Sequence, residues 1–349
     1  MRNMKELIDK LEKNRILSHD ELAVLIEDNS KETLEYLNER ADAVRRIAFG
    51  NSVYIRGLIE FTNYCKNDCF YCGLRLSNKN VDRYRLTKEQ ILDCCQKGYA
   101  LGFRTFVLQG GEDPYWNDTR LLVLIEEIKA RYPDCALTLS IGERPKESYE
   151  KLKLAGADRF LLRHETADAK HYAVLHPKEM SHENRVQCLK NLKEIGYQTG
   201  CGFMVGSPGQ TTDTIIEDLL FIKELQPEMV GIGPFLPAAD TPFSDREPGS
   251  VELTLRLLSI IRLMNPKVLL PATTALGTAS ESGRSRGIRA GSNVIMPNLS
   301  PSDVREKYSI YDNKLATGVE GSEGLKELKL EIEKIGYKIE VTRGDSPMV

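Results

Sequence analysis

The alternation of strand-like and helix-like segments is the feature of this 349-residue chain that most restricts its fold. Beyond about residue 50, short apolar runs alternate with longer segments whose apolar residues are spaced as on one face of a helix. The strand-like runs are 53–61, 104–108, 135–141, 158–163, 198–205, 229–235, 268–272 and 292–296. This alternation predicts a parallel sheet, and eight units over roughly 250 residues predict an α/β fold, a (β/α)8 barrel of the TIM type.

Helices are predicted between these strands, and the first has a clear start signal. Thr87 is followed three residues later by Gln90, which is the pattern of a capping box. The predicted helices are 87–101, 118–131, 146–155, 181–195, 212–225, 251–264 and 281–289. Because no low-complexity linker interrupts the pattern, we expect one barrel rather than two domains.

The two ends of the chain are predicted to extend the barrel. Residues 1–50 show helical spacing repeatedly among many Lys and Glu residues. Near the other end, apolar residues spaced as on one helix face are followed by a short apolar run at 339–341 and an end that looks disordered; the spaced residues are Leu325, Leu328, Ile332 and Ile335. The predicted division is a helical extension over 1–50, the barrel over 51–300 and a C-terminal extension over 301–349 packed on it.

Charge and hydropathy exclude several classes of function. The chain has 48 Lys and Arg against 51 Asp and Glu residues, so no long-range field attracts nucleic acid or an anionic membrane. The first 14 residues are charged throughout, and no run approaches the roughly 18 apolar residues of a membrane span. We expect a cytoplasmic protein with no nucleic-acid or membrane partner. A reducing compartment also suits its eight cysteines.

Three of those cysteines lie within eight residues, directly after the first predicted strand. Cys65, Cys69 and Cys72 have the spacing C-x3-C-x2-C, with an aromatic residue just before the last. A four-iron cube takes four ligands, so three thiolates leave one iron open to a small chelating molecule. A closed zinc site needs a fourth ligand, and no Cys or His lies between residues 73 and 93. The alternatives are zinc or buried structural thiols.

The residues at the predicted strand ends are unusually polar, and in such barrels the chemistry gathers there. Each has a structural explanation as well. Gly110 and Gly111 could form a turn, His164 is more typical of a hydrogen-bonded interior residue than of a metal ligand, and Met204 is more typical of a core. Arg163 and Glu165 point the same way on a strand and could pair with each other.

Taken together, the charged residues favour a cavity for a zwitterion or a carboxylate. Arg56 lies inside the first predicted strand, where a buried charge requires an anionic partner. Arg56, Arg163 and Arg185 suit a carboxyl group, whereas Glu112 and Glu165 suit amino and hydroxyl groups.

With these residues assembled, the chain resembles the radical S-adenosylmethionine (SAM) maturases of FeFe hydrogenase of the HydE type. These belong to a group that includes biotin synthase and methylornithine synthase. The resemblance runs from about residue 53 to 298. The stretches that carry it are YCKNDCFYCGLR, RYRLT, VLQGGEDPY, LSIGERP, GADRFLLRHETA, GFMVGSPGQT, MVGIGPFLP, PATTA and GSNVIMPN.

The resemblance implies roles for individual residues. Cys65, Cys69 and Cys72 would ligate a catalytic 4Fe-4S cluster. Residues around the strand ends would contact SAM: Tyr71, Gly110, Gly111, Glu112, Ser140, Glu165, Arg185 and Met204. Residues inside the barrel would line a substrate cavity: Arg56, Gln109, Thr138, Arg163, Thr273, Thr274 and Met296.

It also implies an activity and partners. The reduced cluster would cleave SAM to a 5'-deoxyadenosyl radical, which would act on a cysteine-bound iron complex carrying CO and cyanide. A ferredoxin or flavodoxin would supply electrons, and other hydrogenase maturases would supply or accept the small molecule. The last cysteine is Cys201, so no C-terminal cysteines could hold a second cluster, and one cluster is predicted.

Two alternatives stay open at this point, and a third is disfavoured. An amino-acid mutase resembling methylornithine synthase would share the single cluster and the carboxylate-binding cavity. A noncatalytic iron-cluster carrier would not explain the polar strand ends. Biotin synthase is disfavoured, because strands three and four end in Ser140 and Arg163 rather than in cysteines for a sulfur-donating cluster.

Overall fold

The predicted parallel sheet forms in the computed structural model, which describes residues 4–315 and 321–348. Six strands lie side by side, each hydrogen-bonded to the next in parallel: β2 (Gly57–Thr62), β3 (Thr105–Gly110), β4 (Ala136–Ser140), β5 (Arg159–Leu161), β6 (Gln198–Cys201) and β8 (Met229–Val230). Two short pieces, β7 (Met204–Val205) and β9 (Gly233–Pro234), continue β6 and β8 beyond a break and pair with each other.

The sheet closes into a barrel through β1 and β10. β1 (Ser52–Ile55) precedes β2 directly and pairs with β10 (Val294–Ile295). Between β8 and β10, the predicted strand at 268–272 makes only single bridges, with Leu269 O accepting from Val230 N at 2.9 Å and Ala272 N donating to Val294 O at 2.9 Å. The predicted (β/α)8 barrel is confirmed, with its seventh strand reduced to these bridges.

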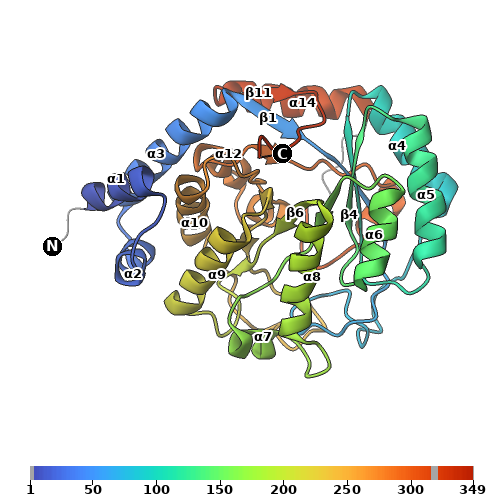
Figure 1. Ribbon diagram of the computed structural model, residues 1–349, viewed down its shortest axis with the longest axis horizontal. Helices are drawn as coiled ribbons and strands as arrows, with labels where there is room; N and C mark the ends of the chain where they lie inside the picture. The colour runs from blue at the N-terminus through green and yellow to red at the C-terminus, as the bar shows by residue number, and fades with distance from the viewer. Residues whose placement is uncertain (1–3, 316–320, 349) are drawn as a thin grey trace.

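Helices surround the barrel (Figure 1). The predicted ones are found to within two residues: α4 (Lys88–Ala100), α5 (Asp118–Arg131), α6 (Lys146–Leu154), α8 (His182–Ile195), α9 (Thr212–Leu225), α10 (Val251–Met264) and α12 (Gly283–Arg289). Thr87 and Gln90 make both bonds of the predicted capping box. Three short helices were not predicted: α7 (Ala169–Leu175), α11 (Thr274–Ala279) and α13 (Ser302–Arg305).

Three helices precede the barrel: α1 (Met4–Asn14), α2 (His19–Glu27) and α3 (Lys31–Phe49). They lie against α9 and α10 at one side of the molecule (Figure 1). Two arginines buried at this contact donate to backbone carbonyls, Arg45 to Ser292 O at 3.1 Å and Arg262 to Gly291 O at 2.9 Å. Carbonyl acceptors compensate for the loss of water around such buried donors.

Residues 321–348 have defined positions in the structure, so the predicted disordered end is wrong. After α14 (Gly321–Lys334), β11 (Lys338–Glu340) pairs in parallel with β1. The last residues then cross the amino-terminal end of the barrel. There Asp345 Oδ1 accepts from Arg159 Nη2 at 2.6 Å and Gln198 Nε2 at 2.8 Å. This polar end is held in place by contacts with strand residues that are far away in the sequence. The composition of the end itself does not reveal these contacts.

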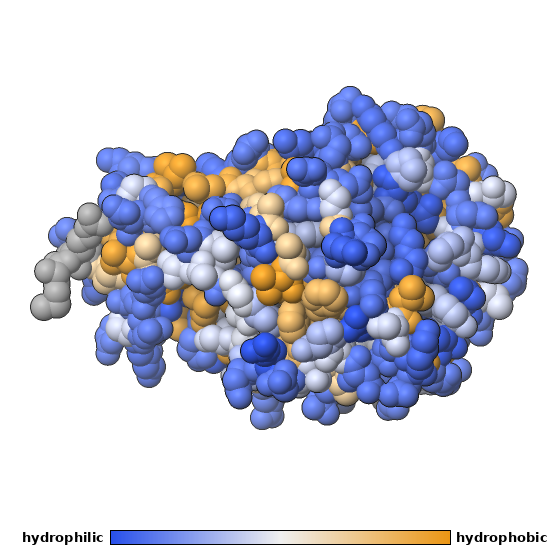
Figure 2. Space-filling view, turned by 90° about the horizontal axis from the view of Figure 1, so that it is seen from below, coloured by the Kyte–Doolittle hydropathy of each residue, from blue (hydrophilic) through white to orange (hydrophobic). Residues whose placement is uncertain are grey.

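Figure 2 views the molecule from the side of α7, and hydrophilic residues cover most of that face. Among residues 4–315 and 321–348, no helix combines the length and the apolar character that crossing a bilayer requires.

Candidate active site

The cysteine loop between β2 and α4 is held by its own polar side chains. Arg83 donates to the backbone oxygens of Asn63, Leu74, Arg75 and Asn78 at 2.5–3.2 Å. Arg75 also forms a two-bond ion pair with Asp68 at 2.8 and 2.7 Å. Because these bonds satisfy the carbonyls of a loop without regular structure, the loop has a defined conformation.

The three thiols of this loop are partly buried and lie close enough to affect one another. Burial and, after it, the charge of the neighbouring Cys65 raise the pKa of Cys72 to about 12. Burial and the charge of Cys72 also raise the pKa of Cys69 well above its usual value. Neutral thiols are therefore favoured in the protein alone, and cationic iron would reverse that preference. This set of donors fits an iron-sulfur cluster.

A single metal ion is a different case. In the described part of the chain, no three His, Cys, Asp or Glu side chains gather closely enough to hold one ion. A four-iron cube does not need that arrangement, since each thiolate binds a separate iron. The other five cysteines are buried: Cys94, Cys95, Cys135, Cys188 and Cys201.

The two glycines at the end of β3 have a packing role. A Cβ on Gly111 would lie 2.3 Å from Tyr64 O and 2.7 Å from Cys65 Cβ, and one on Gly110 would lie 2.7 Å from Thr62 Cγ2. The missing side chains thus let the cysteine loop lie directly on β3. In the same contact Glu112 N lies 3.4 Å from Cys65 Sγ and donates to it. Gly111 therefore lies next to Cys65, and the contacts of Gly110 and Gly111 with SAM stay predictions.

Tyr71, a residue of the cysteine loop, lies between an apolar cluster and a histidine. Its ring packs with Phe70 against buried apolar residues that include Met204 and Phe235. The core interpretation of Met204 is therefore confirmed, and its contact with SAM stays a prediction. The Tyr71 hydroxyl lies 3.2 Å from Nε2 of His176, a residue that the sequence analysis did not select.

Glu165 has a strained backbone at the end of β5. Its φ is +67°, a left-handed backbone conformation that is uncommon for non-glycine residues and that recurs at functional sites. The Glu165 Oε2 and Arg163 Nη2 atoms are 3.3 Å apart, so the predicted pair exists. Neither atom, however, has a hydrogen-bond partner in the described part of the chain. These buried and unsatisfied atoms fit a site that a polar ligand completes.

Arg185 and His164 occupy two different environments. Arg185 is buried, and it donates to Glu143 Oε1 at 2.5 Å and to Arg163 O at 2.9 Å, so it lies next to the Arg163–Glu165 pair. His164 is fully buried, with Nε2 3.2 Å from Asp218 Oδ1, which confirms that it is an interior residue.

Ser140 ends β4 and is half-buried, and its contact with SAM stays a prediction. The sequence analysis assigned no role to Glu143, although this residue belongs to the stretch LSIGERP that carries part of the resemblance.

A cavity of about 160 Å³ lies inside the barrel, and five of the seven predicted substrate residues line it: Gln109, Arg163, Thr273, Thr274 and Met296. The other two, Arg56 and Thr138, line a smaller void of about 10 Å³ together with Arg159. Leu161 and Met229 line both spaces. The structure therefore does not bring Arg56 and Thr138 to the main cavity.

The expected anionic partner of Arg56 is also not found. Within residues 4–315 and 321–348 no carboxylate lies within ion-pair distance of this fully buried side chain. Its closest acceptors are Met229 Sδ at 3.0 Å and Gly344 O at 3.4 Å. Burial lowers the pKa of Arg56, the charge of Arg159 lowers it further, and Asp345 acts in the opposite direction. A carboxylate of the C-terminal segment thus acts on Arg56 without pairing with it.

An ion pair in the main cavity was missed. Glu60, on β2, is fully buried, and its Oε1 lies 2.5 Å from Lys314 Nζ while its Oε2 accepts from Asn298 Nδ2 at 2.8 Å. Lys314 belongs to a segment over the barrel mouth, where Ile310 O accepts from Gly73 N at 3.0 Å. An acid inside an apolar strand was a signal for Glu60, whereas no local signal marks Lys314.

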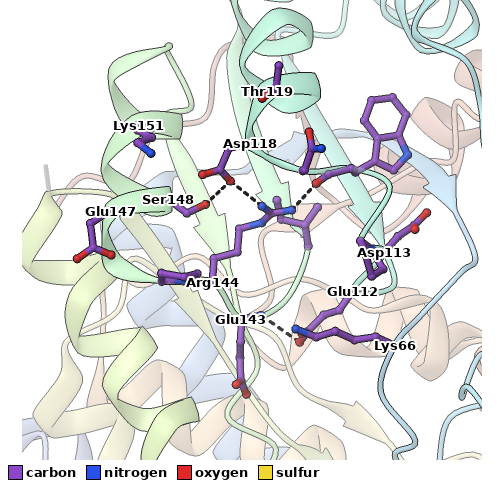
Figure 3. Close-up of a pocket in the computed structure, with 15 residues that line it drawn as sticks. Lys66, Glu112, Asp113, Asp118, Thr119, Glu143, Arg144, Glu147, Ser148 and Lys151 are labelled. Atoms are coloured by element: carbon purple, nitrogen blue, oxygen red, sulfur yellow. Dashed lines mark hydrogen bonds and ion pairs between the residues drawn. The ribbon is translucent and has the colours of Figure 1, made fainter.

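A separate pocket of about 590 Å³ lies between the loops after β3 and β4 and the starts of α5 and α6 (Figure 3). In it Arg144 Nη1 donates to Asp118 Oδ1 at 2.9 Å. At its edge Lys66 Nζ lies 3.3 Å from Glu112 Oε2, and Glu112 Oε1 accepts from Glu143 N at 3.0 Å. Both carboxylate oxygens of Glu112 thus have protein partners, and its contact with SAM stays a prediction.

Comparison with known proteins agrees with this geometry. The model of the radical SAM superfamily matches residues 59–222. The FeFe hydrogenase maturase subunit HydE of Thermotoga maritima is 46% identical over 311 residues, which cover 89% of this chain and 88% of that protein. The chain belongs to the radical SAM superfamily.

Two further comparisons place this radical SAM enzyme near another branch. 3-Methylornithine synthase of Methanosarcina acetivorans is 33% identical, over 86% of this chain and 84% of that protein. The crystal structure of a methylornithine synthase superposes with a TM-score of 0.86 at 31% identity, covering 96% of this chain and 97% of that one. Membership of the superfamily implies a 4Fe-4S cluster and SAM.

Proposed function

We propose that this radical SAM enzyme is a HydE-type maturase of FeFe hydrogenase, acting on a small cysteine-bound iron complex with CO and cyanide. The observation that carries the proposal is the 46% identity with HydE of Thermotoga maritima over 89% of the chain. The cavity of about 160 Å³ supports it, because a small complex fits such a space and a macromolecule does not.

The residues divide into three roles. Cys65, Cys69 and Cys72 hold one 4Fe-4S cluster, which when bound supplies the electron for the reductive cleavage of SAM. Arg163 and Glu165 form an ion pair, but their buried atoms have no hydrogen-bond partner in the described part of the chain: the Glu165 oxygen accepts from a hydroxyl of the ligand, and the Arg163 nitrogens bind a carboxylate.

The protein must also exclude water from the cavity, since water quenches or diverts reactive intermediates. The segment with Ile310 and Lys314 lies over the mouth of the barrel, where it contacts the cysteine loop and the cavity. Other hydrogenase maturases and a ferredoxin or flavodoxin are the partners that this function requires. A cytoplasmic location stays a prediction.

An amino-acid mutase is the second candidate, favoured by the TM-score of 0.86 with methylornithine synthase. The two candidates differ in substrate. A mutase of this type cleaves SAM when free L-lysine is present, whereas a HydE-type enzyme requires the iron complex or a sulfur-containing analogue of it.

Anaerobic reconstitution tests both candidates. The cluster is followed by EPR with and without SAM, and 5'-deoxyadenosine is assayed with dithionite, alone and with L-lysine. Cys69→Ala should lose iron and SAM cleavage, whereas Cys94→Ala, which removes a buried thiol of α4, should retain both. Full cluster occupancy and cleavage in Cys69→Ala would contradict the proposal.

A further inference from the structure

His176 lies between two tyrosine rings, that of Tyr71 in the cysteine loop and that of Tyr172 on α7. The Tyr71 hydroxyl lies 3.2 Å from His176 Nε2, and His176 Nδ1 lies 3.0 Å from the backbone oxygen of Tyr172. A carbonyl oxygen only accepts, so Nδ1 carries the proton, and Nε2 of the neutral ring accepts from Tyr71. Burial and, after it, the charge of Arg185 lower the pKa of His176 to about 3, so the ring is neutral at pH 7.

Tyr172 stacks on His176 with ring centroids 3.9 Å apart and an angle of 24° between planes, and the edge of His182 lies against it at 5.3 Å. The orientation of Tyr172 is thus fixed on two sides. Tyr172 lies on α7 and His176 is the C-cap of that helix, and Tyr172 is not part of the main hydrophobic cluster of the core.

The hydroxyl of Tyr172 is buried and unused. The residue is 2% exposed, yet its oxygen has no hydrogen-bond partner in the described part of the chain. Burying a hydroxyl without a partner is unfavourable, so most such groups in proteins are paired. Burial raises the pKa of this hydroxyl, Arg185 lowers it, and Glu143, Cys69 and Glu165 raise it further. Arg185, Cys69 and Glu165 belong to the proposed cluster and SAM site, and Glu143 is the partner of Arg185.

We propose that the Tyr172 hydroxyl is a SAM ligand that hydrogen-bonds an oxygen of the bound molecule, and that His176 positions Tyr172 and Tyr71 for this contact. The inference rests on the proposed radical SAM function. It assigns Tyr172 a binding role and His176 a positioning role, since His176 acts through its two neighbours. The competing explanation is that Tyr172 only packs.

Removal of the hydroxyl separates these explanations. In reconstituted Tyr172→Phe the dissociation constant of SAM, measured by anaerobic equilibrium dialysis, should rise about tenfold, which corresponds to about 1.4 kcal/mol. The SAM-free protein should unfold at the same denaturant concentration as the wild type or a higher one, since an unpaired buried hydroxyl does not stabilise it. Competition with methionine or 5'-deoxyadenosine then shows which half of SAM the hydroxyl contacts.

Tyr197→Phe is the matched control. Tyr197 is also buried, but its hydroxyl donates to Tyr149 O at 2.7 Å and it precedes β6, at the other end of the strand from the cysteine loop. Its loss should lower the unfolding midpoint and leave the SAM dissociation constant unchanged. Tyr172→Phe should thus weaken SAM binding without lowering stability, whereas Tyr197→Phe should lower stability without weakening SAM binding.

A double-mutant cycle between His176 and Tyr71 tests the positioning role of His176. His176→Phe keeps a ring for Tyr172 to stack on but leaves the Tyr71 hydroxyl without its acceptor. SAM affinity should fall in this variant. Tyr71→Phe should then lower SAM affinity by less in the His176→Phe background than it does in the wild type. Additive effects would show that His176 does not act through Tyr71.

Equal SAM affinity of the wild type and Tyr172→Phe would overturn the inference and leave the proposed function intact. If the reconstituted wild type itself does not bind SAM, the proposed function fails and this inference fails with it.

Discussion

Replacement of Lys314 by methionine should destabilise the protein by about 3–5 kcal/mol, because it leaves Glu60 buried without its cation. The two side chains are 9% and 0% exposed, and their charged atoms are 2.5 Å apart. An exposed pair typically contributes only about 0–1 kcal/mol, so burial accounts for the difference. Methionine retains most of the apolar stem of lysine, so the substitution removes mainly the charge.

The loss should depend on pH in a defined direction. Burial raises the pKa of Glu60, and Lys314 acts against that increase. Without Lys314 the folded-state pKa rises further above the unfolded value of about 4.3. The penalty for a charged Glu60 is complete above the folded pKa, and it disappears as pH falls to the unfolded value, because both states are then protonated. The difference in stability between wild type and variant should therefore decrease from about pH 8 to about pH 4.

Urea unfolding of the cluster-free protein, followed by circular dichroism at several pH values, measures both effects. Lys97→Met on α4 is the matched control, since Lys97 and Asp93 are 72% and 53% exposed at 2.7 Å, and it should cost less than about 1 kcal/mol. Glu60→Gln combined with Lys314→Met should recover most of the lost stability. A Lys314→Met cost as small as that of Lys97→Met, with no pH dependence, would refute the reasoning.

Three further substitutions test separate parts of the structure. Gly111→Ala should reduce the iron bound per chain after reconstitution, because its Cβ would lie 2.3 Å from Tyr64 O, whereas Gly277→Ala, with 3.4 Å to its nearest atom, should not. Asp345→Asn should destabilise the protein at pH 7 by an amount that decreases below about pH 4. Burial raises the pKa of Asp345, but hydrogen bonds from Arg343 and Gln198 outweigh this effect and lower it, so the contribution exists above the unfolded pKa of about 3.9 and is lost as pH falls. Thr87→Ala should cost about 1 kcal/mol in urea unfolding with SAM binding unchanged, since it removes only the cap of α4.

Most helices could be predicted because their apolar spacing and their end signals are both local. The bounds of α5, α9 and α10 agree with the prediction at both ends. The strand predicted at 268–272 failed as a regular ladder for a reason in its own residues. Pro271 has no N–H to donate, and Leu270 N donates to Asn293 Oδ1 at 2.8 Å instead of to a strand.

The site was predicted where the motif is local and missed where the contact spans the chain. The cysteine loop follows from eight consecutive residues, but the acceptor of Tyr71 is His176 and the cation of Glu60 is Lys314. The members of each pair are more than 100 residues apart, and contacts at such separations produce no periodic pattern in the sequence. Glu60 could nevertheless have been selected from the sequence. Like Arg56, it is a charged residue inside an apolar strand, where a buried charge requires a partner of opposite charge.

The C-terminal segment closes both ends of the barrel, and both closures neutralise a buried charge. At the mouth, Lys314 neutralises Glu60 beside the cavity. At the amino-terminal end, Asp345 accepts from Arg159. A barrel cut at residue 300 would retain both buried charges without their partners, and each such loss costs several kcal/mol against a total stability of about 5–15 kcal/mol. The residues after 300 are therefore part of what allows a charged cavity to exist inside this barrel.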